Sequence, residues 1–170
     1  MRARIRVKAS DMIMMAVMGA SLAVTLSGAR WSYESGSALH DFFLYQFSHA
    51  NVWHWLANML VLWQFRPRTS TWAAAYAISV LAAMADAWLW GEATCGMSAL
   101  ACAAVARKYA AWRHEKGWKG KTVLAVMTLA MMITMPRVNW HVHLVAFGMG
   151  YAMWCGVYEW RKRGRGLNQR

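Results

Sequence analysis

Residues 49–65 of the chain read HANVWHWLANMLVLWQF. From Val52 to Phe65 this stretch is almost entirely apolar, and its polar side chains include His54 and Asn58. A polar or ionisable group within an apolar, membrane-embedded segment is costly, and by default it indicates function. The stretch therefore predicts a membrane helix that carries part of a functional site.

The rest of the chain repeats this apolar character. Apolar residues make up 59% of the 170 residues, compared with roughly 45–50% in soluble domains. They form six blocks with no period-two alternation, which excludes strands and favours helices. The blocks are Met12–Ser27, Val52–Phe65, Thr71–Trp90, Ser98–Trp112, Thr122–Met135 and Trp140–Trp160. Although several are shorter than the ~20 residues that a straight span prefers, six such blocks with little polar sequence between them favour a membrane bundle over a soluble protein. We therefore predict an all-α membrane protein with six transmembrane helices and a single domain over residues 1–170.

The positive charges indicate how this bundle is oriented. The formal net charge is +12. If the N-terminus is inside and six spans follow, every Lys and Arg except Arg30 and Arg137 lies on the inner side. Such an asymmetry is what the positive-inside rule describes. We therefore interpret the charge as topology and contact with the lipid bilayer rather than nucleic-acid binding, with residues 1–10 and 161–170 as basic cytoplasmic tails.

Two features of the chain permit another interpretation. The basic residues before Met12 and the apolar run after it resemble a signal peptide, but the run is long and more spans follow, so we favour an uncleaved first helix. The chain has three cysteines, Cys95, Cys102 and Cys155. An odd number argues against a disulfide framework, and a nucleophilic role for Cys95 is the less favoured alternative.

The polar residues of three blocks are expected to converge. In the predicted topology the second, fourth and sixth helices all begin at the outer side, and His54 and Asn58, Ser98, and His143 lie in their first turns. At 1.5 Å per residue these side chains are about 5–15 Å below the outer interface. A seryl hydroxyl becomes nucleophilic when a base takes its proton, and His143 is the candidate base for Ser98.

The same residues can supply the other parts of a serine hydrolase. His54, Asn58 and the Ser98 amide can donate hydrogen bonds to a tetrahedral oxyanion. No acidic residue is paired with His54 or His143 in the sequence, which predicts a dyad rather than a triad. Each residue also has a possible role that is purely structural. Ser98 could be a helix serine that donates to a backbone carbonyl, His143 a hydrogen-bonded core histidine, and Asn58 a link between helices.

The order of these motifs resembles the rhomboid intramembrane serine proteases. The resemblance lies in Phe47-Ser-His-Ala with His54 and Asn58, then Gly96-x-Ser98, then His143 with Gly150. It implies that Ser98 is the nucleophile, that His143 is the base and that His54 and Asn58 form the oxyanion hole. His49 and Gly96 would have supporting roles. The chain departs from the family where glycine is usual, with Ala99 directly after the serine and Ala146 three residues after the histidine, and its first outer loop has Arg30-Trp31 instead of Trp-Arg.

The resemblance also implies a function. It predicts a serine endopeptidase that cleaves the transmembrane segments of other membrane proteins near their outer end, without a cofactor or metal. We expect an integral, multi-pass protein of the bacterial cytoplasmic membrane, with its active site toward the outer side and the block Thr122–Met135 as a lateral gate. The sequence does not predict the oligomeric state or the identity of the substrate.

Three other functions compete with this one. A catalytically inactive rhomboid-like protein that binds membrane helices is the first. A membrane metal or haem protein is the second, and its imidazole ligands would come from a set of four histidines: His49, His54, His141 and His143. A transporter is the least favoured, because no intramembrane carboxylate pair suggests ion coupling.

Overall fold

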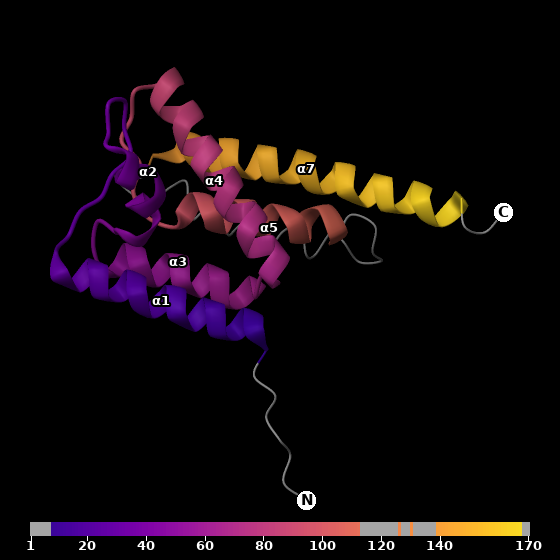
Figure 1. The fold of residues 1–170 in the computed structure, drawn as a ribbon, viewed down its shortest axis with the longest axis horizontal. Helices are drawn as coiled ribbons and strands as arrows, with labels where there is room; N and C mark the ends of the chain where they lie inside the picture. Colours follow the sequence, from indigo (N-terminus) through magenta and orange to yellow (C-terminus); the bar gives the residue numbers. More distant parts are fainter. Residues whose placement is uncertain (1–7, 113–125, 127–129, 131–138, 168–170) are drawn as a thin grey trace, which may run out of the picture.

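The computed structural model describes residues 8–112, 126, 130 and 139–167 of the chain, and it is helical with short connections (Figure 1). The elements in chain order are α1 (Ala9–Ser27), α2 (Leu39–Leu44), the 3-10 helix η1 (Tyr45–Phe47), α3 (Val52–Phe65), α4 (Thr69–Leu89), α5 (Ser98–Trp112) and α7 (Trp140–Leu167). Among the described residues the only strand-like pairing is an isolated bridge between Tyr33 and Thr94. The prediction of an all-α fold is confirmed.

The predicted apolar blocks agree closely with the observed helices. α3 and α5 have the predicted bounds at both ends, whereas α7 continues seven residues beyond Trp160. α3 begins where the Asn51 side chain accepts the His54 N–H at 2.9 Å, and it ends where Arg66 takes a left-handed conformation before Pro67. The block Thr122–Met135, with its proposed gate, lies outside the described residues apart from residues 126 and 130.

Helices α2 and η1 were not predicted. Residues 29–48 are polar and aromatic and lie between the first two apolar blocks, so the sequence predicts a loop there, but the structure has these two short helices within it. They are held by tertiary contacts: the Tyr45 hydroxyl donates to the Ser79 carbonyl of α4 at 2.8 Å, and the Tyr76 hydroxyl donates to the Phe43 carbonyl at 2.9 Å. Their short sequences carry no helical periodicity of their own, so only the folded structure reveals them.

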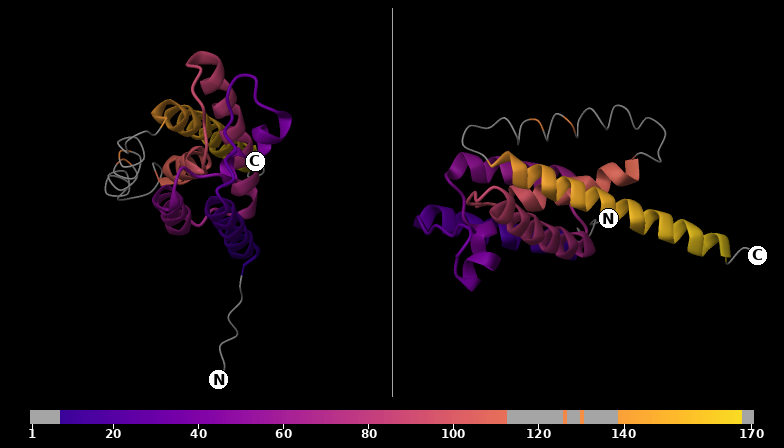
Figure 2. Two further views of the ribbon diagram at one scale, coloured as in Figure 1. Left: turned by 90° about the vertical axis from the view of Figure 1, so that its left-hand side faces the viewer. Right: turned by 90° about the horizontal axis from the view of Figure 1, so that it is seen from above.

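The helices form a bundle in which α3, α5 and α7 run in one direction and α1 and α4 run in the other (Figure 1). The first turns of α3, α5 and α7 therefore lie at the same end of the bundle, which we call the common end; Figure 2 (left) looks along the helices from this end. α5 is central, and every side chain from Ser98 to Ala106 is buried in the core of the bundle. Arg107 is the first partly exposed residue after this run. An alanine-rich helix allows three neighbours to approach it closely.

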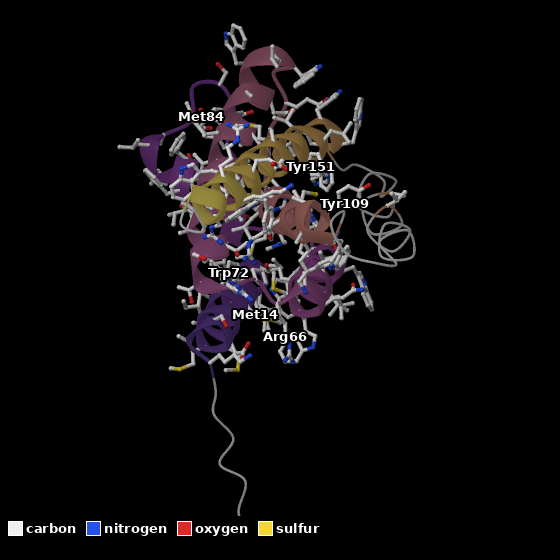
Figure 3. All side chains as sticks on the ribbon, turned by 90° about the vertical axis from the view of Figure 1, so that its right-hand side faces the viewer. Met14, Arg66, Trp72, Met84, Tyr109 and Tyr151 are labelled. Carbon is white, nitrogen blue, oxygen red and sulfur yellow. The ribbon has the colours of Figure 1, made fainter. Side chains whose placement is uncertain are left out.

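Among the described helices, α5 and α7 make the most extensive contact. A Cβ atom added at Gly150 of α7 would lie 3.1 Å from the Ala103 carbonyl oxygen and 3.1 Å from the Ala106 Cβ of α5. Further along the two helices, the rings of Tyr109 and Tyr151 meet at a centroid distance of 5.6 Å, and both are labelled in Figure 3. Gly150 therefore fixes how far α7 is shifted along α5.

Many large apolar side chains are exposed on the outside of the bundle. α1 buries only Met14 and Ser21, and Trp53, Trp88 and Trp160 are each at least three quarters exposed. Two helices within the described residues, α1 and α4, are long and apolar enough to span a membrane by length and composition. α3 and α5, with 14 and 15 residues, are too short for that criterion.

Candidate active site

Ser98 is the first residue of α5 and lies at the common end. It is 4% exposed, and the Ala101 N–H donates to the Met97 carbonyl at 2.8 Å in the first turn of the helix. The preceding Gly96 has a φ of +91° and its N–H donates to the Tyr45 carbonyl at 2.9 Å. The connection before Ser98 is thus attached to η1, and Ser98 is placed on a helix start whose amides point toward the same end.

Gly96 lies against the rings of two predicted site residues. A Cβ atom at this position would be 3.1 Å from His54 Cε1 and 3.2 Å from His49 Cδ2. The two rings are themselves in edge-to-face contact with centroids 5.3 Å apart. The structure therefore brings His49, His54 and the segment before Ser98 together.

His49 lies in the connection between η1 and α3, and it supports the segment before Ser98 directly. The Met97 N–H donates to His49 Nε2 at 3.4 Å, and Nδ1 is 3.5 Å from the Thr25 hydroxyl of α1. Burial, together with the proximity of His54, lowers the pKa of His49 to about 4. His49 is therefore neutral at physiological pH, and its Nε2 is the acceptor in the bond with Met97.

Asn58 shares a face of α3 with His54, one turn further along. It is 2% exposed, and within the described part of the chain its Nδ2 group has no hydrogen-bond partner. A buried amide donor without a partner is costly. It is the kind of group that a developing oxyanion could satisfy.

His143 lies in the first turn of α7 and is 1% exposed. It precedes Gly150 by seven residues, which is two turns or about 10.5 Å along the axis. α5 runs in the same direction, and two turns back from the Gly150 contacts at Ala103 and Ala106 are residues 96–99. His143 is therefore level with Ser98 on the neighbouring helix.

The two positions where the family usually has glycine are accommodated by alanine. Ala99 and Ala146 are both completely buried. His141, two residues before His143, faces elsewhere: its ring stacks on Trp90 at 4.6 Å, and its Nδ1 is 3.7 Å from a Glu92 carboxylate oxygen. This separates His141 from the His49–His54 pair.

Two alternative roles that the sequence permits, a metal site and a nucleophilic Cys95, can be compared with these contacts. In the described part of the chain no three His, Cys, Asp or Glu side chains are arranged to hold a metal ion. Cys95 lies in the connection before Ser98, where burial raises the pKa of its thiol despite the nearby Arg30. A raised pKa disfavours the thiolate and hence a nucleophilic role for Cys95.

A cavity of about 220 Å³ lies behind the start of α5. Its wall includes Met97 and Leu100, which flank Ser98, but none of Ser98, His143, His54 and Asn58. The remaining wall comes from α1, η1 and α4: Ile13, Val17, Gln46, Phe47, Trp72, Ala73 and Tyr76.

Asp86 does not lie where the predicted topology puts it. That topology assigns Asp86, with Glu34, Asp41 and Glu92, to the outer loops, whereas the structure has it within α4 and completely buried. The Asn139 amide and the Thr94 hydroxyl both donate to its Oδ2 oxygen. The one available signal was that Asp86 is the only acidic residue of the block Thr71–Trp90.

Comparison with models of protein families gives a match over residues 36–160, to the Rhomboid domain. The match covers well over half of the chain and contains all of the site residues described above. Comparisons with curated proteins and with solved structures give no match.

Proposed function

The chain belongs to the rhomboid family, and we propose that it is an intramembrane serine endopeptidase with Ser98 as nucleophile and His143 as base. The family assignment implies an integral membrane protein, and the family acts on transmembrane substrates within the lipid bilayer. Our proposal is that this chain cleaves the transmembrane segments of membrane proteins near their outer end.

One observation carries the proposal. Ser98 begins α5, and the contact of Gly150 with Ala103 and Ala106 sets His143 level with it on the parallel helix α7. The segment before Ser98 lies against His54. A hydroxyl, an imidazole and hydrogen-bond donors at one depth, from three different helices, match the requirements of acyl transfer better than those of packing.

The chemistry follows from these positions. His143 takes the proton of Ser98 as Oγ attacks the carbonyl carbon of the scissile bond, and the carbonyl oxygen becomes an oxyanion. The Ser98 N–H, His54 and Asn58 donate hydrogen bonds to that oxygen. The C–N bond then breaks as His143 returns the proton to the leaving amine, and water releases the acyl group by the same steps.

A substrate helix cannot react while its peptide bonds are internally hydrogen-bonded. A transmembrane segment satisfies its backbone groups within the helix. It must unwind locally before Ser98 can reach a carbonyl. This requirement favours substrates whose helices are weakened by small residues close to their outer end.

We further propose that six helices span the membrane, with the N-terminus inside and the common end outside. The distribution of Lys and Arg supports this orientation, since only Arg30 and Arg137 would lie outside. Exposed tryptophans near both ends of the bundle, such as Trp88 and Trp160, are typical of interfacial belts. A bacterial cytoplasmic membrane is the setting that we propose.

The test is labelling of the detergent-purified full chain with a fluorophosphonate, together with cleavage of a transmembrane substrate in proteoliposomes. We expect the native chain to be labelled and to cleave, and Ser98→Ala and His143→Ala each to lose both activities by at least about 1,000-fold. Ser27→Ala, which removes an exposed hydroxyl at the end of α1, is the matched control and should behave as the native chain.

The opposite result has a definite meaning. A native chain that is helical by circular dichroism but neither reacts with the phosphonate nor cleaves would overturn the proposal. The binding of membrane helices without catalysis would then be the better description of its function.

A further inference from the structure

The buried carboxyl group of Asp86 joins three segments of the chain. Its Oδ2 accepts a hydrogen bond from the Asn139 Nδ2 group, which precedes α7, and lies 3.5 Å from the Thr94 hydroxyl, in the connection before α5. The Asn139 amide also reaches the Thr94 hydroxyl at 3.4 Å. We call this set of three side chains the Asp86 clamp.

Stability alone does not explain the clamp, because a buried carboxyl group is a costly way to hold helices together. Asp86 is completely buried, and its Oδ1 atom has no hydrogen-bond partner among the described residues. No Lys or Arg in the same part of the chain forms an ion pair with it. Replacing such a group with a well-packed apolar side chain is often neutral or stabilising, so a role other than stability accounts better for its presence.

The two partners of Asp86 occupy equivalent positions relative to the candidate dyad. Thr94 comes four residues before Ser98, and Asn139 comes four residues before His143. Asn139 also caps α7, because its Oδ1 accepts the Val142 N–H at 3.4 Å. Thr94 is held further by two backbone hydrogen bonds with Tyr33, both at 2.9 Å.

We propose that Asp86 is a positioning residue that holds the starts of α5 and α7 in register, so that the Ser98 hydroxyl and the His143 imidazole face each other. The inference rests on the proposed function of Ser98 and His143. Gly150 sets the register of α5 and α7 two turns further along, and the Asp86 clamp sets it at the active-site end.

The first experiment compares Asp86→Ala, Thr94→Val and Asn139→Ala in the full chain. A displacement of about 1 Å at a catalytic group can cost on the order of 100-fold in rate. We expect Asp86→Ala to lower kcat and the rate of fluorophosphonate labelling by about 100-fold, with KM for a transmembrane substrate changed by less than roughly twofold. Thr94→Val and Asn139→Ala should each show a smaller loss, of about 10-fold. Glu92→Gln changes a nearby carboxylate outside the clamp and should leave both rates unchanged.

An exchange of the two clamp side chains separates positioning from folding. Asn139→Asp places two carboxyl groups in contact and should be as harmful as Asp86→Ala. The double variant Asp86→Asn with Asn139→Asp restores one amide and one carboxyl group, and Asp remains a good N-cap for α7. We expect the double variant to label at least about 10-fold faster than Asn139→Asp. No recovery, or native rates in Asp86→Ala, would overturn the inference.

Hydrogen exchange tests the clamp independently of catalysis. In Asp86→Ala, the amides of residues 94–98 and 139–143 should both exchange at least about 10-fold faster than in the native chain. Unchanged exchange in either segment would overturn the clamp even in an active enzyme. A native chain that fails to label, but shows faster exchange in both segments on Asp86→Ala, would overturn the proposed function and leave the clamp as a link between the two helix starts.

Discussion

At the residue scale, the rings of His49 and His54 leave space at Gly96 for a hydrogen atom only. Both rings lie within 3.2 Å of where a Cβ atom would be, and the φ of +91° disfavours any L side chain. The segment that leads to Ser98 can therefore approach the two histidines only if residue 96 is glycine. Closeness of this backbone to His54 is what the oxyanion site requires.

Gly96→Ala should therefore separate the Ser98 segment from His54. We expect a loss of about 100-fold in kcat/KM and a destabilisation of about 1–3 kcal/mol from the positive φ. Gly91→Ala is the matched control, because Gly91 also has a positive φ (68°) but nothing within 4 Å of its added Cβ. It should be destabilised similarly with little loss of activity, as measured by substrate cleavage and thermal unfolding. Equal losses of activity in the two variants would show that strain, and not the contact with the rings, is responsible.

His49 should make the stability of the protein dependent on pH. Its pKa is about 4 in the folded chain and about 6.5 when exposed. As the pH falls through this interval the unfolded chain takes up the proton first, so stability is present above pH 6.5 and is lost between about 6.5 and 4. The upper limit of the effect is about 3 kcal/mol.

The measurement is the apparent Tm in detergent between pH 7 and pH 4. His49→Gln should reduce the fall of Tm over this interval, whereas His40→Gln, at an exposed position, should leave it as in the native chain. A fall of Tm that is equally steep in His49→Gln would contradict the assignment of this dependence to His49.

The residues of the candidate site differ in how well the sequence predicts them. Ser98, His143, His54 and Asn58 could be proposed from the sequence because each interrupts or opens an apolar block at a corresponding depth. Asp86 could not, since its partner Asn139 is 53 residues away and no periodicity connects them. Such a contact depends on how α4 and α7 pack, which short-range patterns do not contain.

At the element scale, the contact of Gly150 with α5 determines the relative position of Ser98 and His143. The contacts of a Gly150 Cβ would include backbone atoms of Ala103, at 3.1 and 3.2 Å. A backbone cannot give way as a flexible side chain can. A side chain at residue 150 must therefore push α7 away from α5 or slide it along the helix.

Gly150→Ala should consequently lower activity through α7. We expect kcat to fall by roughly 10-fold to 100-fold, with a destabilisation of about 1–3 kcal/mol from overpacking. Gly148→Ala is the control on the same helix, since nothing lies within 4 Å of its added Cβ. It should retain activity and gain a little helix stability, about 0.5–1 kcal/mol. If Gly150→Ala cleaves at the native rate, the register of α5 and α7 is not set at this contact.

The helix bounds show why some elements are predictable and others are not. α3 follows a capping residue, Asn51, and ends before Pro67, so local chemistry defines both of its ends. Local sequence does not define the end of α7, because its last residues are basic and polar and no apolar periodicity marks where it stops. α2 and η1 depend on hydrogen bonds with α4, in which Tyr76 donates and the Ser79 carbonyl accepts, and they could be found only in the folded structure.

At the scale of the whole molecule, the bundle combines helices of unequal length. α3 and α5 are about 21 and 22 Å long at 1.5 Å per residue, whereas the hydrocarbon core of a typical bilayer is about 30 Å thick. α4 has 21 residues and matches that thickness. The two short helices carry three of the candidate site residues, His54 and Asn58 on α3 and Ser98 on α5.

This inequality predicts that the protein is more stable in thin bilayers. Mismatch costs a fraction of a kcal/mol per Å, so the apparent Tm in liposomes should decrease as the acyl chains lengthen from 14 to 18 to 20 carbons. Circular dichroism during heating measures this directly. A Tm that rises with acyl-chain length would indicate that the short helices do not have to match the bilayer by themselves.

The contact of Gly96 with two imidazole rings also restricts how the protein can evolve. A codon change at residue 96 introduces a side chain where His49 and His54 already fill the space. Such a change can be inherited without loss of the site only after one of the rings has been replaced by a smaller group. Among descendants of this gene, a side chain at residue 96 should therefore be found only together with a smaller side chain at residue 49 or residue 54.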